Sequence, residues 1–132
     1  EKGLMERHKT AMLKSIFELG TTPIKEIMIP ETSIISINVN SSQKETLDLF
    51  SKYQFTRLPV FEEKSDNIIG MVHQKDFFQL LSRSEDKPLR DIVRPIMFIP
   101  ESAKVLRVLK EFREQRMHIA MVLNEFGSIT GL

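Results

Sequence analysis

The sequence lacks cysteine and tryptophan and has only one tyrosine and five glycines among its 132 residues. The absence of cysteine excludes disulfide bonds, a thiol nucleophile and zinc sites built on thiolates. No run of apolar residues approaches the ~18–20 that a membrane-spanning helix needs, and no signal-peptide pattern is present. These absences leave a chain that has to fold by burying an ordinary apolar core.

The chain also lacks an excess of charge of either sign. Lys and Arg number 19 against 18 Asp and Glu, which gives a formal net charge of +1. A balance of this kind carries no electrostatic signature of nucleic-acid binding. Apolar residues make up 41% and charged residues 28% of the chain, values typical of a globular domain.

Catalytic motifs are missing as well. The three histidines, His8, His73 and His118, are far apart and form no HxxxH or HExxH pair, so we interpret them as packed or surface residues. No phosphate-binding GxxxxGK[ST] loop and no GxSxG nucleophile motif occurs. The carboxylates of Glu62 and Glu63 lie in a polar turn and are expected to be solvated. The sequence therefore predicts a protein that is not an enzyme.

The chain does contain an internal repeat. Residues 23–30 (PIKEIMIP) match residues 88–95 (PLRDIVRP) at an offset of 65. The correspondence continues in the same order at offsets of 62 and then 61, where Phe50 matches Phe112 and residues 68–71 match residues 129–132. Small changes of offset between elements are typical of homologous copies, so two related units are expected.

The first copy has a β-α-β-β-α pattern. Alternation at Ile35, Ile37 and Val39 predicts a strand. Ser42 and Glu45 form a capping box for a helix whose apolar stripe is Leu47, Phe50 and Tyr53. Two short apolar runs, 57–61 and 68–73, predict strands separated by a turn at Asp66 and Asn67. A helix over 76–81 then closes the copy, with Phe77, Leu80 and Leu81 on its apolar side.

The second copy repeats this plan. Ser102 is the predicted N-cap of a helix with apolar residues at Val105, Val108, Leu109 and Phe112. Strands are predicted over 118–123 and 128–132, with Asn124 and Gly127 in the turn. By comparison with the first copy, about 10–15 further residues are expected after Leu132, and the chain is interpreted as a fragment of a longer protein.

Residues 1–19 predict a separate leader helix. Leu4 or Met5, His8, Met12, Ile16 and Leu19 fall on one face, and Gly20 is the predicted helix-ending residue. The expected organisation is a leader over 1–20, a first domain over 21–84 and a second over 85–132. The predicted fold class is α+β, with two half-domains packed about a pseudo-two-fold axis because neither buries its sheet face alone.

The segments IKEIMIP, FTRLPVF, NIIGMVHQKDFFQLL, VRPIMFIPES and FREQRMHIAMVLNEFGSITGL resemble the CBS domain pair of the CorC/HlyC (hemolysin-like) and CNNM family. That family is linked to magnesium and cobalt transport. The resemblance covers about residues 21–132, and it identifies the chain as a tandem CBS pair whose second copy is truncated.

The resemblance implies an adenine nucleotide, ATP or AMP, as ligand, with ATP and magnesium typical of the family. The implied nucleotide-binding residues are Met28, Ile29, Pro30, Thr56, Arg57, Pro59 and Asp76. Ile34 and Ile35 are apolar neighbours that could complete a slot for adenine together with Met28 and Ile29. The second copy's own Thr-x-x-Asp motif would follow Leu132. In the first copy His73 stands where threonine or serine is usual, and Glu31 stands where arginine is common.

Other interpretations of these residues are open. The apolar ones could be core, Arg57 could be a solvated strand-edge arginine, and Asp76 could be a first-turn acid of a helix, where it complements the helix dipole. Two hypotheses for the whole chain follow: a regulatory nucleotide-sensing module, or a dimerisation module with no ligand. A cytoplasmic location, a homodimer and a parent protein with a membrane domain are expected, and nucleic acid is not.

Overall fold

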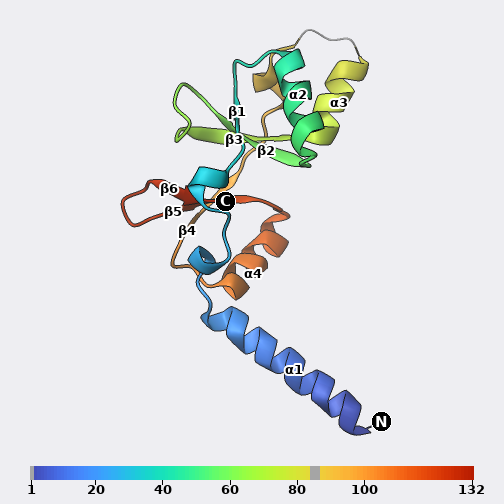
Figure 1. The fold of residues 1–132 in the computed structure, drawn as a ribbon, viewed down its shortest axis with the longest axis vertical. Coiled ribbons are helices and arrows are strands. Elements are labelled where there is room, and N and C mark those ends of the chain that lie inside the picture. Colours follow the sequence, from blue (N-terminus) through green and yellow to red (C-terminus); the bar gives the residue numbers. More distant parts are fainter. Residues whose placement is uncertain (1, 84–86) are drawn as a thin grey trace. The chain divides into compact units, whose positions relative to one another are not determined.

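The computed structural model describes residues 2–83 and 87–132 (Figure 1). The chain forms two compact units. One unit holds the chain up to Thr32 together with Phe98–Leu132, and the other is Ser33–Met97. Three short 3-10 helices, η1 (Ile24–Glu26), η2 (Glu31–Ser33) and η3 (Leu89–Ile92), lie in the connecting segments.

The Ser33–Met97 unit is a three-stranded sheet with two helices. Its strands are β1 (Ile37–Asn38), β2 (Arg57–Phe61) and β3 (Ile68–His73), in that order, with β1 parallel and β3 antiparallel to β2. The helices are α2 (Gln43–Tyr53) and α3 (Gln74–Ser82). The predicted runs 57–61 and 68–73 are confirmed, whereas the strand predicted from Ile35 to Val39 is shorter, because regular pairing with β2 is limited to the two residues of β1.

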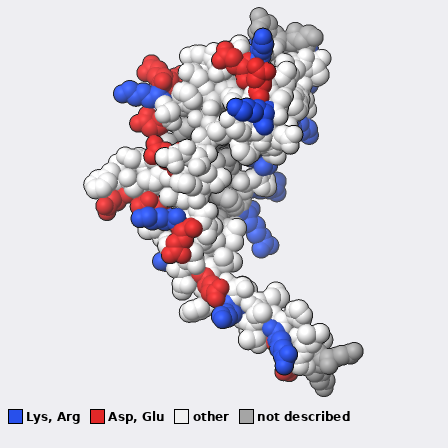
Figure 2. Space-filling view, in the orientation of Figure 1, with Lys and Arg blue, Asp and Glu red and all other residues white. Residues whose placement is uncertain are grey.

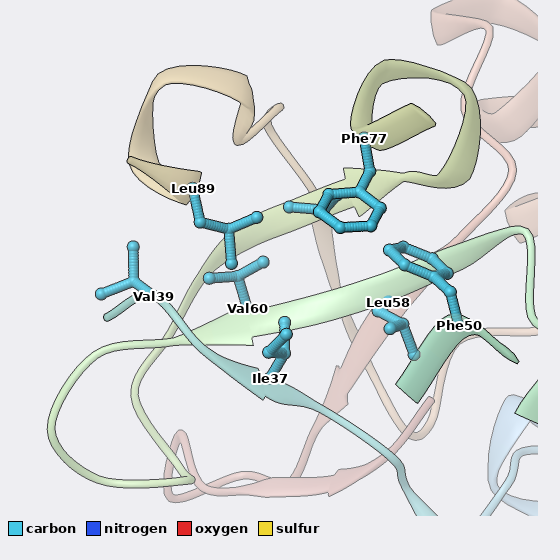
Figure 3. Close-up of a cluster of buried hydrophobic side chains, with 8 residues drawn as sticks. Ile37, Val39, Phe50, Leu58, Val60, Phe77 and Leu89 are labelled. Atoms are coloured by element: carbon cyan, nitrogen blue, oxygen red, sulfur yellow. The ribbon is translucent and has the colours of Figure 1, made fainter. Parts of the chain in front are cut away.

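The core of this unit lies between the helices and the sheet. Phe50 from α2 stacks on Phe77 from α3 with ring centroids 5.5 Å apart, and both are fully buried. They pack with Leu58 and Val60 of the central strand in one hydrophobic cluster (Figure 3). The predicted apolar stripe of α2 is only partly buried, since Leu47 stays 37% exposed.

The capping box at the start of α2 is confirmed. The backbone N–H of Glu45 donates to the Ser42 hydroxyl oxygen at 3.1 Å, and the Glu45 carboxylate accepts from the Ser42 N–H. Two N–H groups that a helix end leaves unpaired thereby gain partners.

The other unit has a matching three-stranded sheet. Its order is β4 (Met97–Pro100), β5 (Ala120–Leu123) and β6 (Ile129–Gly131), with β5 and β6 antiparallel. Helix α4 (Val105–Gln115) buries Val105 and Val108, while Leu109 is 49% exposed. The β5–β6 turn is closed by the side-chain oxygen of Asn124, which accepts from two backbone N–H groups, and by Gly127 at φ 78°.

The predicted N-cap at Ser102 is wrong. Lys104 occupies the N-cap position of α4 and makes no side-chain capping bond. The backbone of Thr22 takes over this function, because its carbonyl accepts from the N–H of Val105 at 2.9 Å. Segment 101–104 is further fixed by a 2.7 Å bond from the N–H of Ile24 to the carbonyl of Ala103. A distant backbone segment thus replaces the local hydroxyl.

The leader helix is confirmed as α1 (Lys2–Thr21). Gly20 lies inside it and does not end it. The chain leaves the helix at Thr22, whose hydroxyl donates to the Glu18 carbonyl at 2.7 Å, and Pro23 follows. The ring of Pro23 disfavours a helical conformation for the residue before it. The apolar side chains of α1 are exposed, namely Leu4, Met5, Met12, Leu13, Ile16 and Phe17.

The predicted α+β class is confirmed, with two small sheets and four α-helices in the described residues. Among those residues, no helix is long and apolar enough to cross a bilayer. Each compact unit combines residues from both sequence repeats. The domain bounds 1–20, 21–84 and 85–132 describe the repeat in the sequence, and they stay a prediction, as does the pseudo-two-fold axis.

Candidate functional site

A glycine at the last strand of the first repeat allows another segment to pair with it. Strand β3 is joined to segment 93–94 by two backbone hydrogen bonds between Met71 and Arg94, each 2.8 Å long. A β-carbon on Gly70 would overlap the carbonyl oxygen of Arg94 and would lie 2.5 Å from a methyl group of Val93. Only glycine permits this approach.

The same arrangement occurs in the other unit. The N–H groups of Ile29 and Leu132 each donate to the other residue's carbonyl at 2.9 Å, beside β6. A β-carbon on Gly131 would lie 2.8 Å from the Ile29 carbonyl oxygen and would also overlap the side chain of Met28. The predicted site segment 28–30 is therefore paired with the last strand of the second repeat.

These two arrangements are related by the repeat. Segment 28–30 corresponds to 93–95, and Gly70 corresponds to Gly131. The opening segment of each repeat thus lies on the last strand of the other repeat, within one compact unit. This places Val93 and Arg94 among the residues of the first repeat's candidate site, although the sequence interpretation did not include them. The match between the segments at an offset of 65 was the signal that could have found them.

The start of α3 forms the polar part of the first repeat's candidate site. His73 is the N-cap, and its Nδ1 accepts from the backbone N–H of Lys75 at 3.0 Å. The N–H of Gln74 donates to the Thr56 carbonyl at 2.8 Å. Asp76 follows in the first turn, and Arg94 donates to its carboxylate from Nε at 2.6 Å and from Nη2 at 2.8 Å. The histidine found in place of threonine or serine therefore keeps the capping function.

Cations gather around this helix start. Arg57 lies directly across from His73 in the β2–β3 register and is half-buried. Burial lowers the pKa of His73, the positive charges of Arg57, Arg94 and Lys75 lower it further, and Asp76 opposes them. A neutral imidazole fits its capping role, because Nδ1 accepts a hydrogen bond only when it carries no proton.

The predicted site residues divide between the two units. Thr56, Arg57 and Asp76 lie near one another around the start of α3. Pro59 is fully buried within β2, and Ile35 packs against the core cluster, so both have packing roles. The full division is Ile34, Ile35, Thr56, Arg57, Pro59 and Asp76 in one unit, and Met28, Ile29 and Pro30 in the other. Whether these residues bind a ligand stays a prediction.

No cluster of His, Asp or Glu that could hold a metal ion occurs in the described part of the chain. Of the three histidines, His8 and His118 are exposed. Charged side chains of both signs are interspersed over the face seen in Figure 2.

Comparison with known proteins matches both repeats to one family. Residues 24–83 and 89–132 fit the model of the CBS domain. The solved structure of the CBS domain of a bacterial CNNM/CorC family Mg²⁺ transporter in complex with ATP is 33% identical, with a TM-score of 0.85, over 94% of this chain and 89% of that one. This chain is a CBS domain pair of the CorC/CNNM family.

Two curated relatives carry the name magnesium and cobalt efflux protein CorC. The protein from Pasteurella multocida (strain Pm70) is 35% identical over 98% of this CBS pair and 43% of its own length. The protein from Escherichia coli (strain K12) is 33% identical over 100% of the CBS pair and 46% of its own length. The CBS pair thus spans less than half the length of these relatives.

Proposed function

We propose that this CBS pair is a regulatory module that binds an adenine nucleotide and controls a CorC-like protein of magnesium and cobalt transport. The supporting observation is the ATP complex of a relative that aligns with 94% of this chain. The names of the two curated relatives support the link to metal transport. The module is proposed to lie in the cytoplasm, on a parent protein with a membrane domain, and to catalyse no reaction.

The nucleotide is proposed to use the second repeat, where segment 28–30 pairs with β6. Ile29 and Pro30 are exposed there, and Met28 is half-buried. Their backbone is fixed by the hydrogen bonds to Leu132, so an apolar surface suited to an adenine ring is held in place without a ligand. Magnesium would arrive with the phosphates of ATP, since the described residues offer no cluster of their own for it.

Arg57 is proposed as a phosphate donor, as the resemblance implies. A guanidinium can offer two parallel hydrogen bonds to a phosphate, and alanine offers none. Arg57→Ala should weaken ATP binding by about 1.5–3 kcal/mol, roughly tenfold to a hundredfold, and leave adenosine affinity unchanged. Arg113→Ala, at an exposed position on α4, is the matched control. Equal losses for ATP and adenosine would show that Arg57 acts through packing.

The alternative is a dimerisation module without a ligand. It is favoured by the exposed apolar side chains of Leu13 and Phe17 on α1 and of Leu106 and Leu109 on α4. Exposed apolar patches of this kind often mark association surfaces. A homodimer is proposed under both functions, and a light-scattering mass near the monomer value of 15.3 kDa at high concentration would contradict it.

Calorimetric titration separates the two functions. The protein should be titrated with ATP, ADP and AMP, each with and without magnesium. Saturable heat that depends on the nucleotide supports the sensing module. A dimer that gives no heat with any of the three supports the ligand-free module.

A further inference from the structure

The carboxylate of Asp76 already has a partner within its own unit. Both oxygens accept hydrogen bonds from one guanidinium, that of Arg94, in a bidentate pair at 2.6 and 2.8 Å. The Asp76 side chain is only 18% exposed, whereas that of Arg94 is 56% exposed. The carboxylate is therefore the enclosed member of the pair, and the guanidinium covers it from the solvent side.

Both members of this ion pair are held by rigid backbone. Asp76 lies in the first turn of α3, which His73 caps. Arg94 is anchored by its two hydrogen bonds to Met71, and Gly70 allows that close approach. Because the two backbones are already fixed, forming the pair costs little additional entropy beyond that of the two side chains. A free ligand would have to compete for the Asp76 carboxylate with the Arg94 guanidinium, which the fold keeps nearby at a high effective concentration.

The repeat shows that this pair is specific to the first copy. Arg94 corresponds to Ile29 in the other unit, and an isoleucine cannot pair with a carboxylate. Segment 28–30 and segment 93–95 have equivalent backbone pairing, to β6 and β3 respectively. The two candidate subsites therefore share a backbone frame, and at this position only the first one has a charged side chain.

We infer that Arg94 closes the first repeat's subsite to nucleosides by occupying the carboxylate that would otherwise accept ribose hydroxyl groups. This rests on the proposed function, which assigns adenine nucleotides as the ligand class. The consequence is that the Asp76 carboxylate is not available to a ribose as long as the ion pair is intact. Arg94 thereby determines specificity, because its own guanidinium occupies the carboxylate that a ribose would use.

Space next to the pair is compatible with this role. A cavity of about 310 Å³ lies against Asp76 and Arg94 and is also lined by Gln79, Leu80 and Val93. Removing the guanidinium would leave the Asp76 carboxylate, which already lines this cavity, free to accept hydrogen bonds there. The lining combines apolar side chains, those of Leu80, Ile92 and Val93, with polar and charged ones, a mixture that can contact both a ring and its hydroxyl groups.

The test replaces Arg94 with the residue that the other repeat uses. Adenosine and AMP are titrated separately into ¹⁵N-labelled wild-type protein, Arg94→Ile, Arg94→Gln and the double variant Asp76→Asn/Arg94→Ile, following the amide signals of Lys75 and Phe77. Arg83→Ile is the matched control, because Arg83 lines the same cavity and is not part of the bidentate pair. A dispersed amide spectrum establishes that each variant is folded, and Arg94→Gln serves if Arg94→Ile is not.

We expect saturable shifts at these amides in both Arg94 variants, with affinity at least tenfold tighter than in the wild type. The double variant should lose this gain, and Arg83→Ile should behave as the wild type. Wild-type binding at α3 as tight as that of Arg94→Ile, or no binding at α3 in either folded Arg94 variant, would overturn the inference.

Failure of the proposed function gives a different result. ATP-dependent shifts of the Ile29 and Leu132 amides in the wild-type protein report on the second repeat alone. If these ATP-dependent shifts are absent while Arg94→Ile gains adenosine binding at α3, the role of Arg94 in closing the first subsite is supported. The proposal that nucleotide binds at the second repeat is then wrong. If they are present and neither Arg94 variant gains anything at α3, the closure falls and the proposed function stands.

Discussion

Replacing Gly70 with alanine tests the pairing that builds the first repeat's candidate site. The new β-carbon would overlap the carbonyl oxygen of Arg94 and would lie 2.5 Å from a methyl group of Val93. One of these contacts is with backbone, so rotation of a side chain cannot relieve it. The β3 strand and segment 93–94 have to separate, and the two 2.8 Å hydrogen bonds between Met71 and Arg94 are lost or lengthened.

The expected loss follows from these terms. Overpacking in a well-packed region costs about 1–3 kcal/mol, and each backbone hydrogen bond contributes about 1 kcal/mol. The lower entropy of the unfolded chain with alanine offsets about 0.4–1 kcal/mol. We therefore expect Gly70→Ala to lower the free energy of unfolding by roughly 2–4.5 kcal/mol if both hydrogen bonds break, and by less if they only lengthen.

Urea unfolding followed by far-UV circular dichroism measures this loss, and hydrogen exchange of the Met71 and Arg94 amides locates it. Gly20→Ala is the matched control, because its β-carbon would meet only a methyl group of Leu106 at 3.8 Å. Within a helix, that substitution should stabilise the protein by about 0.5–1 kcal/mol. A loss below about 0.5 kcal/mol in Gly70→Ala, which is the ordinary scatter of surface substitutions, together with unchanged protection of both amides, would refute the steric argument.

Three further predictions concern stability. Ser42→Ala should cost about 1 kcal/mol through loss of the capping box, while Ser102→Ala should change the urea midpoint little, because Ser102 caps no helix. Phe77→Ala should cost about 3–5 kcal/mol by opening a cavity against its stacked partner, and Phe126→Ala, at a side chain that is 83% exposed, should be neutral in the same assay. The pKa of His73 in the folded protein lies below its ordinary value of 6.5, so between the folded and the unfolded pKa the unfolded chain binds more protons. The contribution of His73 to stability should therefore be constant above about pH 6.5 and should fall as the pH drops from there through the folded pKa. His73→Ser should keep the cap and flatten this pH dependence in thermal unfolding curves, and an unchanged slope would assign the effect to another group.

Much of the fold follows from local patterns in the sequence. Strands β2 and β3 have the predicted bounds, because short apolar runs between polar turns define them locally. The capping box at Ser42 is also confirmed, since all its atoms lie within one turn. The prediction at Ser102 fails for the opposite reason: the N–H of Val105 at the start of α4 donates to the carbonyl of Thr22, which is distant in the sequence.

The candidate site is less accessible from the sequence. The predicted set mixes residues that the structure assigns to separate units, with Met28 in one and Asp76 in the other. Single-residue arguments do not reveal which segment pairs with which strand. The correspondence between Ile29 and Arg94 was present in the repeat, but its meaning depends on the backbone bonds that bring Arg94 to α3.

The way in which each unit combines both repeats limits how this chain can be divided. Cleavage between the repeats, near residue 86, followed by separation of the two products would remove segment 93–94 from β3 and segment 28–30 from β6 at once. Each product would then expose an unpaired strand edge, which is a site for aggregation. A single repeat expressed alone would gain a partner edge by pairing with a second copy, so the half-molecule is expected to dimerise or precipitate. Duplication of the repeat and stability of the fold are therefore linked, and loss of either copy would disable the other.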